Sequence, residues 1–290
     1  MTAVLDRPAA SGARRRLATG VGGLLRRPGL LLAAAVLAVV GTAAVAPGTF
    51  TSGDPLAGVP RERLQPPGVA HWFGTDQLGR DLFTRVVHGA GRSLTATVIA
   101  VGVGLVVGST IGLLAGFLGR WVDELLMRLV DVLLAVPALL LSLALVTALR
   151  FGTVKIAVAV GVGTIAAFAR VMRAEVLRVR TSTYVEAARA SGVRRHDVLL
   201  RHVLPNAYGP VLALATLEFG VAVLQISALS FLGYGAPPPD PEWGSLVAEG
   251  RNYLATAWWL SALPGLTVTA TVLAAGRVAR ALDGEWGGVR

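Results

Sequence analysis

Six long apolar runs, separated by polar segments, most strongly constrain how this chain of 290 residues can fold. A helix needs about 20 mostly apolar residues to cross the hydrocarbon core of a bilayer. Within that core, backbone polar groups must be satisfied inside the helix. Only 15% of the residues are charged, against about 25% in a typical soluble protein. We therefore predict an all-α integral membrane protein with six transmembrane helices, at 30–46, 94–118, 125–149, 151–171, 211–231 and 258–275.

The start of the chain allows two interpretations. Basic residues, an apolar run and the small residues Ala44-Val45-Ala46 together imitate a secretory signal peptide with its cleavage site. The chain after this run stays apolar, so we expect an uncleaved first helix. The resulting division is a basic cytoplasmic N-terminal tail at 1–28, a first transmembrane helix at 29–46, an extracytoplasmic loop at 47–92, a permease core of five transmembrane helices at 93–283 and a C-terminal tail at 284–290.

The basic residues indicate the orientation of the chain. Most of the 27 lysines and arginines fall on segments that are cytoplasmic if the N-terminus is inside, including eight arginines from Arg170 to Arg201. Such an excess is typical of cytoplasmic loops. Membrane topology thereby accounts for the net charge of +10. We expect the chain to associate with a lipid bilayer and not with nucleic acid. Both termini are predicted to be cytoplasmic.

The polar segment 182–206, between the fourth and fifth runs, carries the strongest local pattern. Thr183 and Glu186 have the spacing of a capping box, which predicts the start of a short helix. Gly192 stands where a left-handed residue would end that helix. A second short helix should follow, and we expect Pro205 to stop it. Two short helices meeting at a glycine would form a projecting knob.

This pattern resembles a known motif. Glu186-Ala187-Ala188, then Gly192, then Leu204-Pro205 is similar to the EAA loop of bacterial ABC-importer permeases. The sequence from Arg201 to Asn206, RHVLPN, resembles that of the dipeptide/oligopeptide/nickel branch, as does GTDQLGRD at 74–81. In that family the loop forms cytoplasmic coupling helices that dock on an ATPase subunit. The resemblance implies docking through Glu186, Ala187, Ala188, Gly192, His202, Leu204, Pro205 and Asn206.

The same resemblance implies the partners and the location. It implies a bacterial plasma membrane protein assembled with a homologous second permease, two ABC ATPase subunits and an extracytoplasmic substrate-binding protein. The only lysine, Lys155, is not part of a Gly-Lys-Ser/Thr phosphate loop. We therefore expect ATP and magnesium on the partner ATPases, with neither a cofactor nor catalysis in this chain. The expected cargo is a di- or oligopeptide; a nickel chelate or another small polar solute is the alternative.

Two polar residues within the fifth run are candidates for the translocation path. Glu218 is a carboxylate at membrane depth, where ionisable groups usually face a bundle interior or a water-filled path. Alternatively, and with equal weight, Glu218 makes a structural hydrogen bond or ion pair with the second permease. Gln225 lies further along the same run, beside Ile226, where the family often has a glutamate. This departure leaves the substrate class open.

Two other functional classes compete with the importer. An ion-gradient-driven transporter would need a coupling site of buried ionisable groups and often an internal repeat. Asp131 and Glu218 are the only candidates, and we see no repeat. A membrane-embedded enzyme would need a nucleophile or metal ligands in the spans. The chain has no cysteine, and its four histidines lie outside the apolar runs.

Smaller patterns give further structural expectations. Glycines every four residues predict a close-packing helix face, and Pro137 predicts a kink in the third span. Arg128 and Asp131 should pair one turn apart, and the turn near residue 78 should be tied by ion pairs. At the C-terminus Arg277 stands where the family would have an acidic residue. The residues concerned are Gly104, Gly108, Gly112 and Gly116 for the glycine face, and Asp76, Arg80 and Asp81 for the turn.

Overall fold

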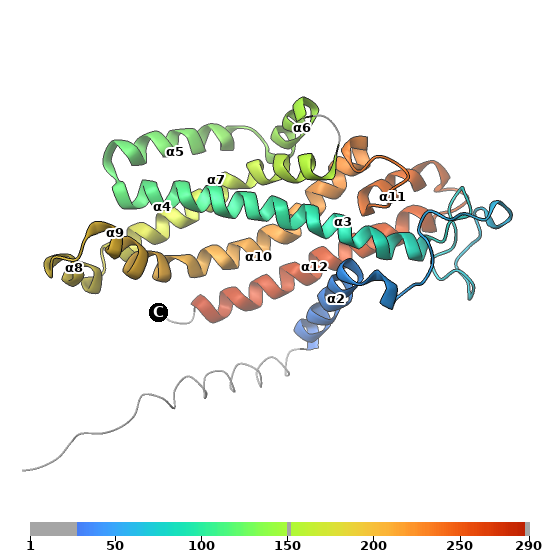
Figure 1. Cartoon of the computed structure of the whole chain (residues 1–290), viewed down its shortest axis with the longest axis horizontal. Coiled ribbons are helices and arrows are strands. Elements are labelled where there is room, and N and C mark those ends of the chain that lie inside the picture. Colours follow the sequence, from blue (N-terminus) through green and yellow to red (C-terminus); the bar gives the residue numbers. More distant parts are fainter. Residues whose placement is uncertain (1–27, 150–151, 288–290) are drawn as a thin grey trace, which may run out of the picture.

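The computed structural model describes residues 28–149 and 152–287, with side chains to Ala281. These residues form an elongated helical bundle (Figure 1). Apart from two isolated bridges they contain no β-structure. The helices are α2 (Pro28–Val45), α3 (Leu82–Val103), α4 (Ser109–Leu118), α5 (Arg120–Ala135), α6 (Ala138–Leu149), α7 (Thr153–Arg180), α8 (Thr183–Ala190), α9 (Arg195–Asp197), α10 (Leu204–Leu229), α11 (Trp243–Gly250) and α12 (Trp259–Gly287).

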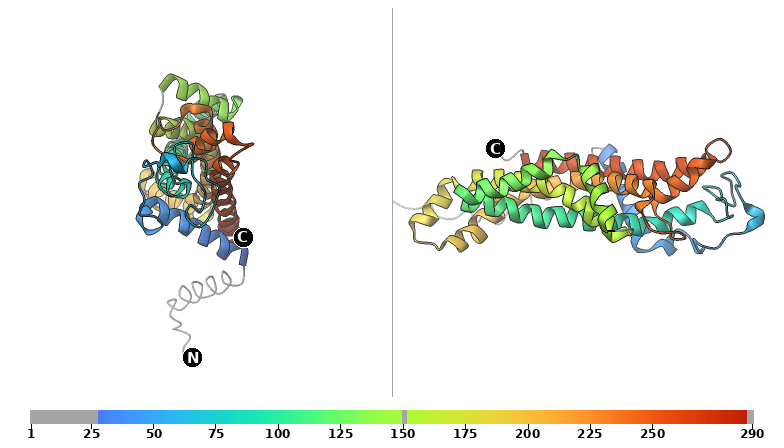
Figure 2. Two further views of the ribbon diagram at one scale, coloured as in Figure 1. Left: turned by 90° about the vertical axis from the view of Figure 1, so that its right-hand side faces the viewer. Right: turned by 90° about the horizontal axis from the view of Figure 1, so that it is seen from above.

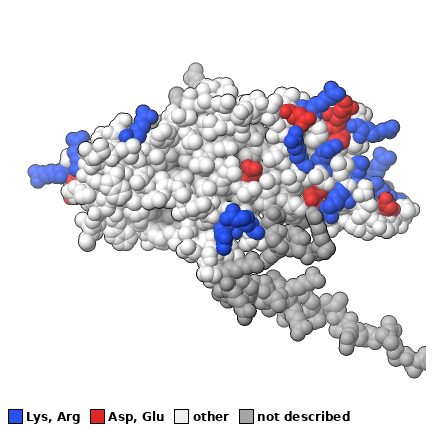
Figure 3. Space-filling view, turned by 180° about the vertical axis from the view of Figure 1, so that it is seen from behind, with Lys and Arg blue, Asp and Glu red and all other residues white. Residues whose placement is uncertain are grey.

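The prediction of an all-α membrane protein is confirmed. Five helical stretches are long and apolar enough to cross a bilayer, and the bent pair α5–α6 would make a sixth span. Charged side chains gather towards the two ends of the bundle and leave a largely uncharged band between them (Figure 3). One end carries α8 and α9; the other carries α11 and residues 47–81 (Figures 1 and 2). We call these the α8 end and the α11 end.

The expected glycine face packs as predicted. A π-turn (Gly104–Gly108) joins α3 to α4, so the two form one continuous helical run. A Cβ on Gly108 or Gly112 would overlap a backbone carbonyl oxygen of α7, at Ile165 and Ala169 respectively. The run therefore lies directly against the α7 backbone, as small residues allow in membrane helices.

The third span differs from its prediction. Pro137 was expected to kink one helix, but α5 and α6 are separate helices bent by 90°. Val136 is extended, as the residue before a proline prefers, so the helix ends there. The predicted Arg128–Asp131 pair is also wrong. Arg128 pairs with Glu124, while Asp131 accepts from Arg170 of α7 at 2.7 Å.

A second ion pair holds α5 to α7. The guanidinium of Arg173 donates to both carboxylate oxygens of Asp123, with 2.7 Å between Nη2 and Oδ2. A bidentate pair of this kind fixes orientation as well as distance. Near the same place Arg180 donates to the carbonyl of Gly116 at the end of α4. The α8 end is thus tied together by arginines of α7.

Candidate functional site

The knob at 182–206 begins with a cap that differs from the prediction. The helix α8 starts at Thr183, and Ser182, rather than Thr183, occupies the N-cap position. No side chain caps this helix, because the Ser182 hydroxyl donates to the carbonyl of Val179 at the end of α7, at 2.6 Å. The expected capping box with Glu186 is therefore not formed. Ser182 instead closes the preceding helix.

Gly192 has the predicted left-handed conformation, with φ of 81°. The Gly192 amide donates to the carbonyl of Arg189, and the Val193 amide donates to that of Ala188. This pair of bonds is a Schellman motif, which satisfies carbonyls left free at a helix end. A Cβ on Gly192 would meet nothing within 4 Å. Its requirement for glycine therefore comes from the backbone conformation and not from crowding.

Pro205 does not stop the second short helix. The chain runs on as helix from α9 through a π-turn (Val198–Val203) into α10, with Pro205 in the first turn of α10. Pro205 has no amide hydrogen to donate within this run, and it lies just after the π-turn, where the regular α-helical hydrogen-bond pattern is already interrupted. The side chain of Asn206 donates to the carbonyl of His202 at 2.7 Å. The knob is therefore continuous with the membrane helix α10.

A small apolar core fixes the knob to the bundle. Val185 of α8 and Val198 and Val203 of the π-turn are fully buried, and they belong to the main apolar cluster together with Val179 of α7. Buried valines of this kind resist displacement because their loss leaves a cavity. The knob is thus packed against α7 and continuous, through the π-turn, with α10.

The outer surface of the knob is exposed. Glu186, Ala187 and Gly192 are exposed, Ala188, His202 and Leu204 are half-buried, and Pro205 and Asn206 are exposed. Tyr184, Val193 and Leu200 expose large apolar side chains to 47%, 37% and 56%. Within the described residues Glu186 makes no ion pair. Apolar groups beside arginines at a projecting tip are suited to contact with another protein.

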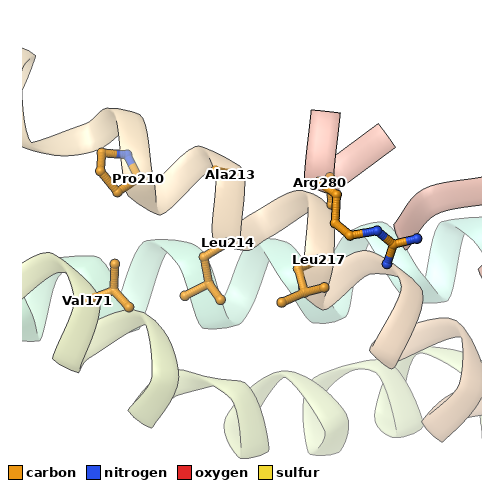
Figure 4. A pocket seen from close by; sticks show the side chains of 7 residues that line it. Val171, Pro210, Ala213, Leu214, Leu217 and Arg280 are labelled. Carbon is orange, nitrogen blue, oxygen red and sulfur yellow. The ribbon is translucent and has the colours of Figure 1, made fainter. Parts of the chain in front are cut away.

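The two candidates for a translocation path share one face of α10, seven residues apart. Glu218 is half-buried and bonds to none of the described residues. The side-chain oxygen of Gln225 is buried and has no hydrogen-bond partner among the described residues. The neighbouring Leu217 lines a pocket of about 210 Å³ between α7, α10 and α12, with Val171 and Arg280 also in its wall (Figure 4). The structure does not join Glu218 and Gln225 into one site.

The α11 end contains a buried ion-pair network, of which the sequence predicts only the part around residue 78. Arg85 lies between Asp76 and Glu249 of α11, at 2.8 and 2.7 Å, and is 1% exposed. Arg80 pairs with Asp76 as expected, at 2.6 Å. Asp81 instead caps α3 by accepting from the Thr84 amide. The pairing of Arg85 with Glu249 spans 164 residues, and no local pattern could reveal it. We call Asp76, Arg80, Arg85 and Glu249 the Arg85 network.

A further buried carboxylate lies at the opposite end of α11 from Glu249. Glu242, at the N-cap of α11, accepts from the amides of Gly244 and Ser245 and from the Ser93 hydroxyl of α3. Burial raises the pKa of its carboxyl above the ordinary value. Together with the Arg85 network it holds α11 against the start of α3. No three His, Cys, Asp or Glu side chains among the described residues are placed to hold a metal ion.

Comparison with known proteins decides the family. A family model described as binding-protein-dependent transport system inner membrane component matches residues 108–286, more than half of the chain. The chain belongs to this family. Its members are permease subunits of ABC transporters, which are membrane channels and not catalysts. As a member, this permease is a multi-pass inner membrane protein.

Curated relatives of the permease cover most of its length. It is 41% identical over 214 residues to the dipeptide transport system permease protein DppC of Alkalihalophilus pseudofirmus, covering 74% of this chain and 70% of the relative. It is also 41% identical over 251 residues to a putative peptide transport system permease of Brucella suis, covering 87% and 84%. A glutathione transport system permease of Pectobacterium atrosepticum is 40% identical, over 72% and 69%.

Solved structures share the fold. The methionine ABC transporter MetNI in an inward-facing conformation matches with a TM-score of 0.55 at 20% identity, over 68% of this chain and 96% of that chain. An amino acid ABC transporter matches with a TM-score of 0.56 at 15% identity, over 70% and 95%. The helical bundle of this permease thus has the fold of ABC transporter permeases.

Proposed function

We propose that this permease imports di- or oligopeptides, and that ATP hydrolysis by partner subunits drives it between outward- and inward-facing states. The observation that carries the coupling proposal is the knob at 182–206, which is exposed outside and anchored inside by buried valines. The peptide cargo is supported by relatives at about 41% identity that are named as dipeptide and peptide permeases. The binding-protein-dependent family favours this over an ion-driven transporter.

The coupling step uses the knob as a rigid handle. An ATPase subunit would bind Glu186, Ala187 and the neighbouring exposed surface of α8. Closure of two ATPase subunits would displace α8, and the buried valines would pass this displacement to α7 and α10. Packed helices respond to such a displacement by small sliding and rocking movements. Docking would also involve Ala188, Gly192, His202, Leu204, Pro205 and Asn206.

The assembly follows from the same proposal. The α8 end faces the cytoplasm, where ATP and magnesium are bound by the two ATPases. The α11 end faces outwards, towards a substrate-binding protein, and a homologous second permease completes the path. Both termini are then cytoplasmic. In this assembly Glu218 and Gln225 face the second permease or the path between the two.

The test is to purify the full chain from membranes of its own source and identify the proteins that accompany it. We expect a second permease and ATPase subunits, and ATP-dependent uptake of labelled dipeptides after reconstitution with the binding protein. Isolation without an ATPase, together with uptake driven by an ion gradient, would contradict the coupling proposal. ATP-dependent uptake of a nickel chelate without peptide uptake would contradict the proposed peptide cargo and leave the coupling proposal standing.

A further inference from the structure

A groove on the outer surface of the bundle carries features that import does not explain. It lies between α2 and α12, which pack against each other (Figure 1), and it has a volume of about 350 Å³. Its walls are Leu32, Ala33 and Val36 of α2 and Ala270, Leu273 and Ala274 of α12. Leu32 and Leu273 are 68% and 66% exposed. The groove is therefore open to the surroundings of the bundle.

Two arginines of α12 complete the wall at one end of the groove. Arg277 and Arg280 lie one turn apart, near the end of the candidate span Trp259–Ala281. The guanidinium of Arg277 reaches Gly29 of α2, since a Cβ built on Gly29 would lie 3.1 Å from Nη2. Among the described side chains neither arginine makes an ion pair. Two positive charges thus stand at the mouth of an apolar channel, and none of the described side chains, which end at Ala281, pairs with them.

The geometry points to an anionic phospholipid, with an acyl chain in the groove and its phosphate on Arg277 and Arg280. From Gly29 to Val36 the α2 wall rises by about 10 Å, which covers part of one acyl chain. Arginine stems near a span end lie along apolar surface while their heads reach the headgroup region. Basic pockets between membrane helices are known to take anionic lipid headgroups.

An apolar helix of a partner chain is the alternative occupant, and charge argues against it. Covering the groove with apolar side chains would desolvate both guanidinium groups without supplying a counter-charge. Burying an unpaired charge is among the most costly events in protein association. A phosphodiester supplies that counter-charge and accepts several hydrogen bonds from arginine. A lipid therefore fits both the apolar and the charged part of the groove.

The proposal is tested by native mass spectrometry of the full chain, with any accompanying subunits, incubated with equal amounts of dioleoylphosphatidylglycerol and dioleoylphosphatidylcholine. We expect the unmodified chain to prefer the anionic lipid. The double variant Arg277→Gln, Arg280→Gln should lose about 25-fold of this preference, since each arginine contributes about fivefold. Ala270→Trp, which fills the exposed groove without a charge change, should reduce retention of both lipids.

Two controls distinguish a lipid site from a general attraction of anions to basic residues. Arg251→Gln removes an exposed arginine at the α11 end and should leave the preference unchanged. An unchanged preference in the double variant would overturn the proposal, as would full lipid retention by Ala270→Trp. Displacement of the lipid by millimolar inorganic phosphate would also overturn it, because the site would then bind free anions. Failure of phosphate to compete is the expected result.

Discussion

Gly192 is the residue on which the shape of the knob depends most. Its φ of 81° lies in the left-handed region, where a residue with a Cβ costs roughly 1–2 kcal/mol. We expect Gly192→Val to leave the membrane helices folded, because Gly192 is exposed and a Cβ there would meet nothing within 4 Å. If this cost of roughly 1–2 kcal/mol is lost from docking, ATPase retention should weaken about five- to thirtyfold. Uptake should fall in parallel. Pull-down of ATPase and uptake measured on one preparation check this.

Gly192→Asn is the matched control, because asparagine tolerates the left-handed conformation far better than valine. It should retain most ATPase binding and uptake. Equal loss in both variants would show that the side chain itself, and not the backbone conformation, is at fault. Full uptake by Gly192→Val would remove this turn from the coupling mechanism.

Glu218 is the residue for which two roles compete most evenly. Glu218→Gln keeps the size of the side chain and removes its charge. If the carboxylate lines the translocation path, we expect uptake to fall at least about tenfold, a loss of roughly 1.4 kcal/mol, while assembly and basal ATP hydrolysis persist. If it holds the second permease, the complex should dissociate during purification. Size-exclusion chromatography alongside uptake distinguishes these outcomes, and unchanged uptake by an intact complex would exclude Glu218 from the path.

The helix α4 tests how closely two elements of the bundle approach. Gly112→Val places a side chain where the carbonyl oxygen of Ala169 and the side chain of Met172 already lie. Overpacking of this kind typically costs about 1–3 kcal/mol, so the thermal unfolding temperature in detergent should fall. Gly102→Val is the control on the preceding helix α3, because a Cβ there meets nothing within 4 Å. An equal loss of stability in both variants would contradict the close contact of α4 with α7.

The docking of α11 on α3 depends on a buried charge that sequence alone did not reveal. Arg85→Met would leave the buried Asp76 with Arg80 as its one remaining arginine in the network and would leave Glu249 without its bidentate contact. Breaking a buried pair in this way costs roughly 3–5 kcal/mol, so we expect a clear loss of thermal stability. Arg92→Gln removes a half-exposed pair with Asp240, and such surface pairs contribute about 0–1 kcal/mol. Stability losses of similar size in both variants would argue against a structural role for the Arg85 network.

The elements divide clearly into those that the sequence could predict and those that it could not. Glycine spacing predicted a close-packing helix face, because that face is defined by one short periodic pattern, but it did not indicate α7 as the partner. Pro137 and Pro205 were both misjudged, since a proline can break, bend or open a helix depending on the turn before it. The capping box failed because Ser182 serves the preceding helix. The Arg85–Glu249 pair joins residues 164 positions apart, which no local rule reaches.

At the scale of the whole molecule, the proposed coupling depends on the difference between the two ends of the bundle. The α8 end is a helical knob with exposed apolar groups among arginines, whereas the α11 end is a loop-rich cap held by buried ion pairs. A largely uncharged band, with few charged groups on the face shown, separates them (Figure 3). The proposed assembly requires ATPase subunits at the first end alone.

Cross-linking from single cysteines tests this requirement most directly, because the chain contains no cysteine of its own. Ala187→Cys places a thiol on the exposed surface of α8, and Ser52→Cys places one on the exposed loop at the α11 end. With a short photoreactive maleimide on the assembled complex, we predict that Ala187→Cys links this chain to an ATPase subunit and that Ser52→Cys does not. Absence of an ATPase adduct from Ala187→Cys, or its appearance from Ser52→Cys, would contradict the proposed coupling.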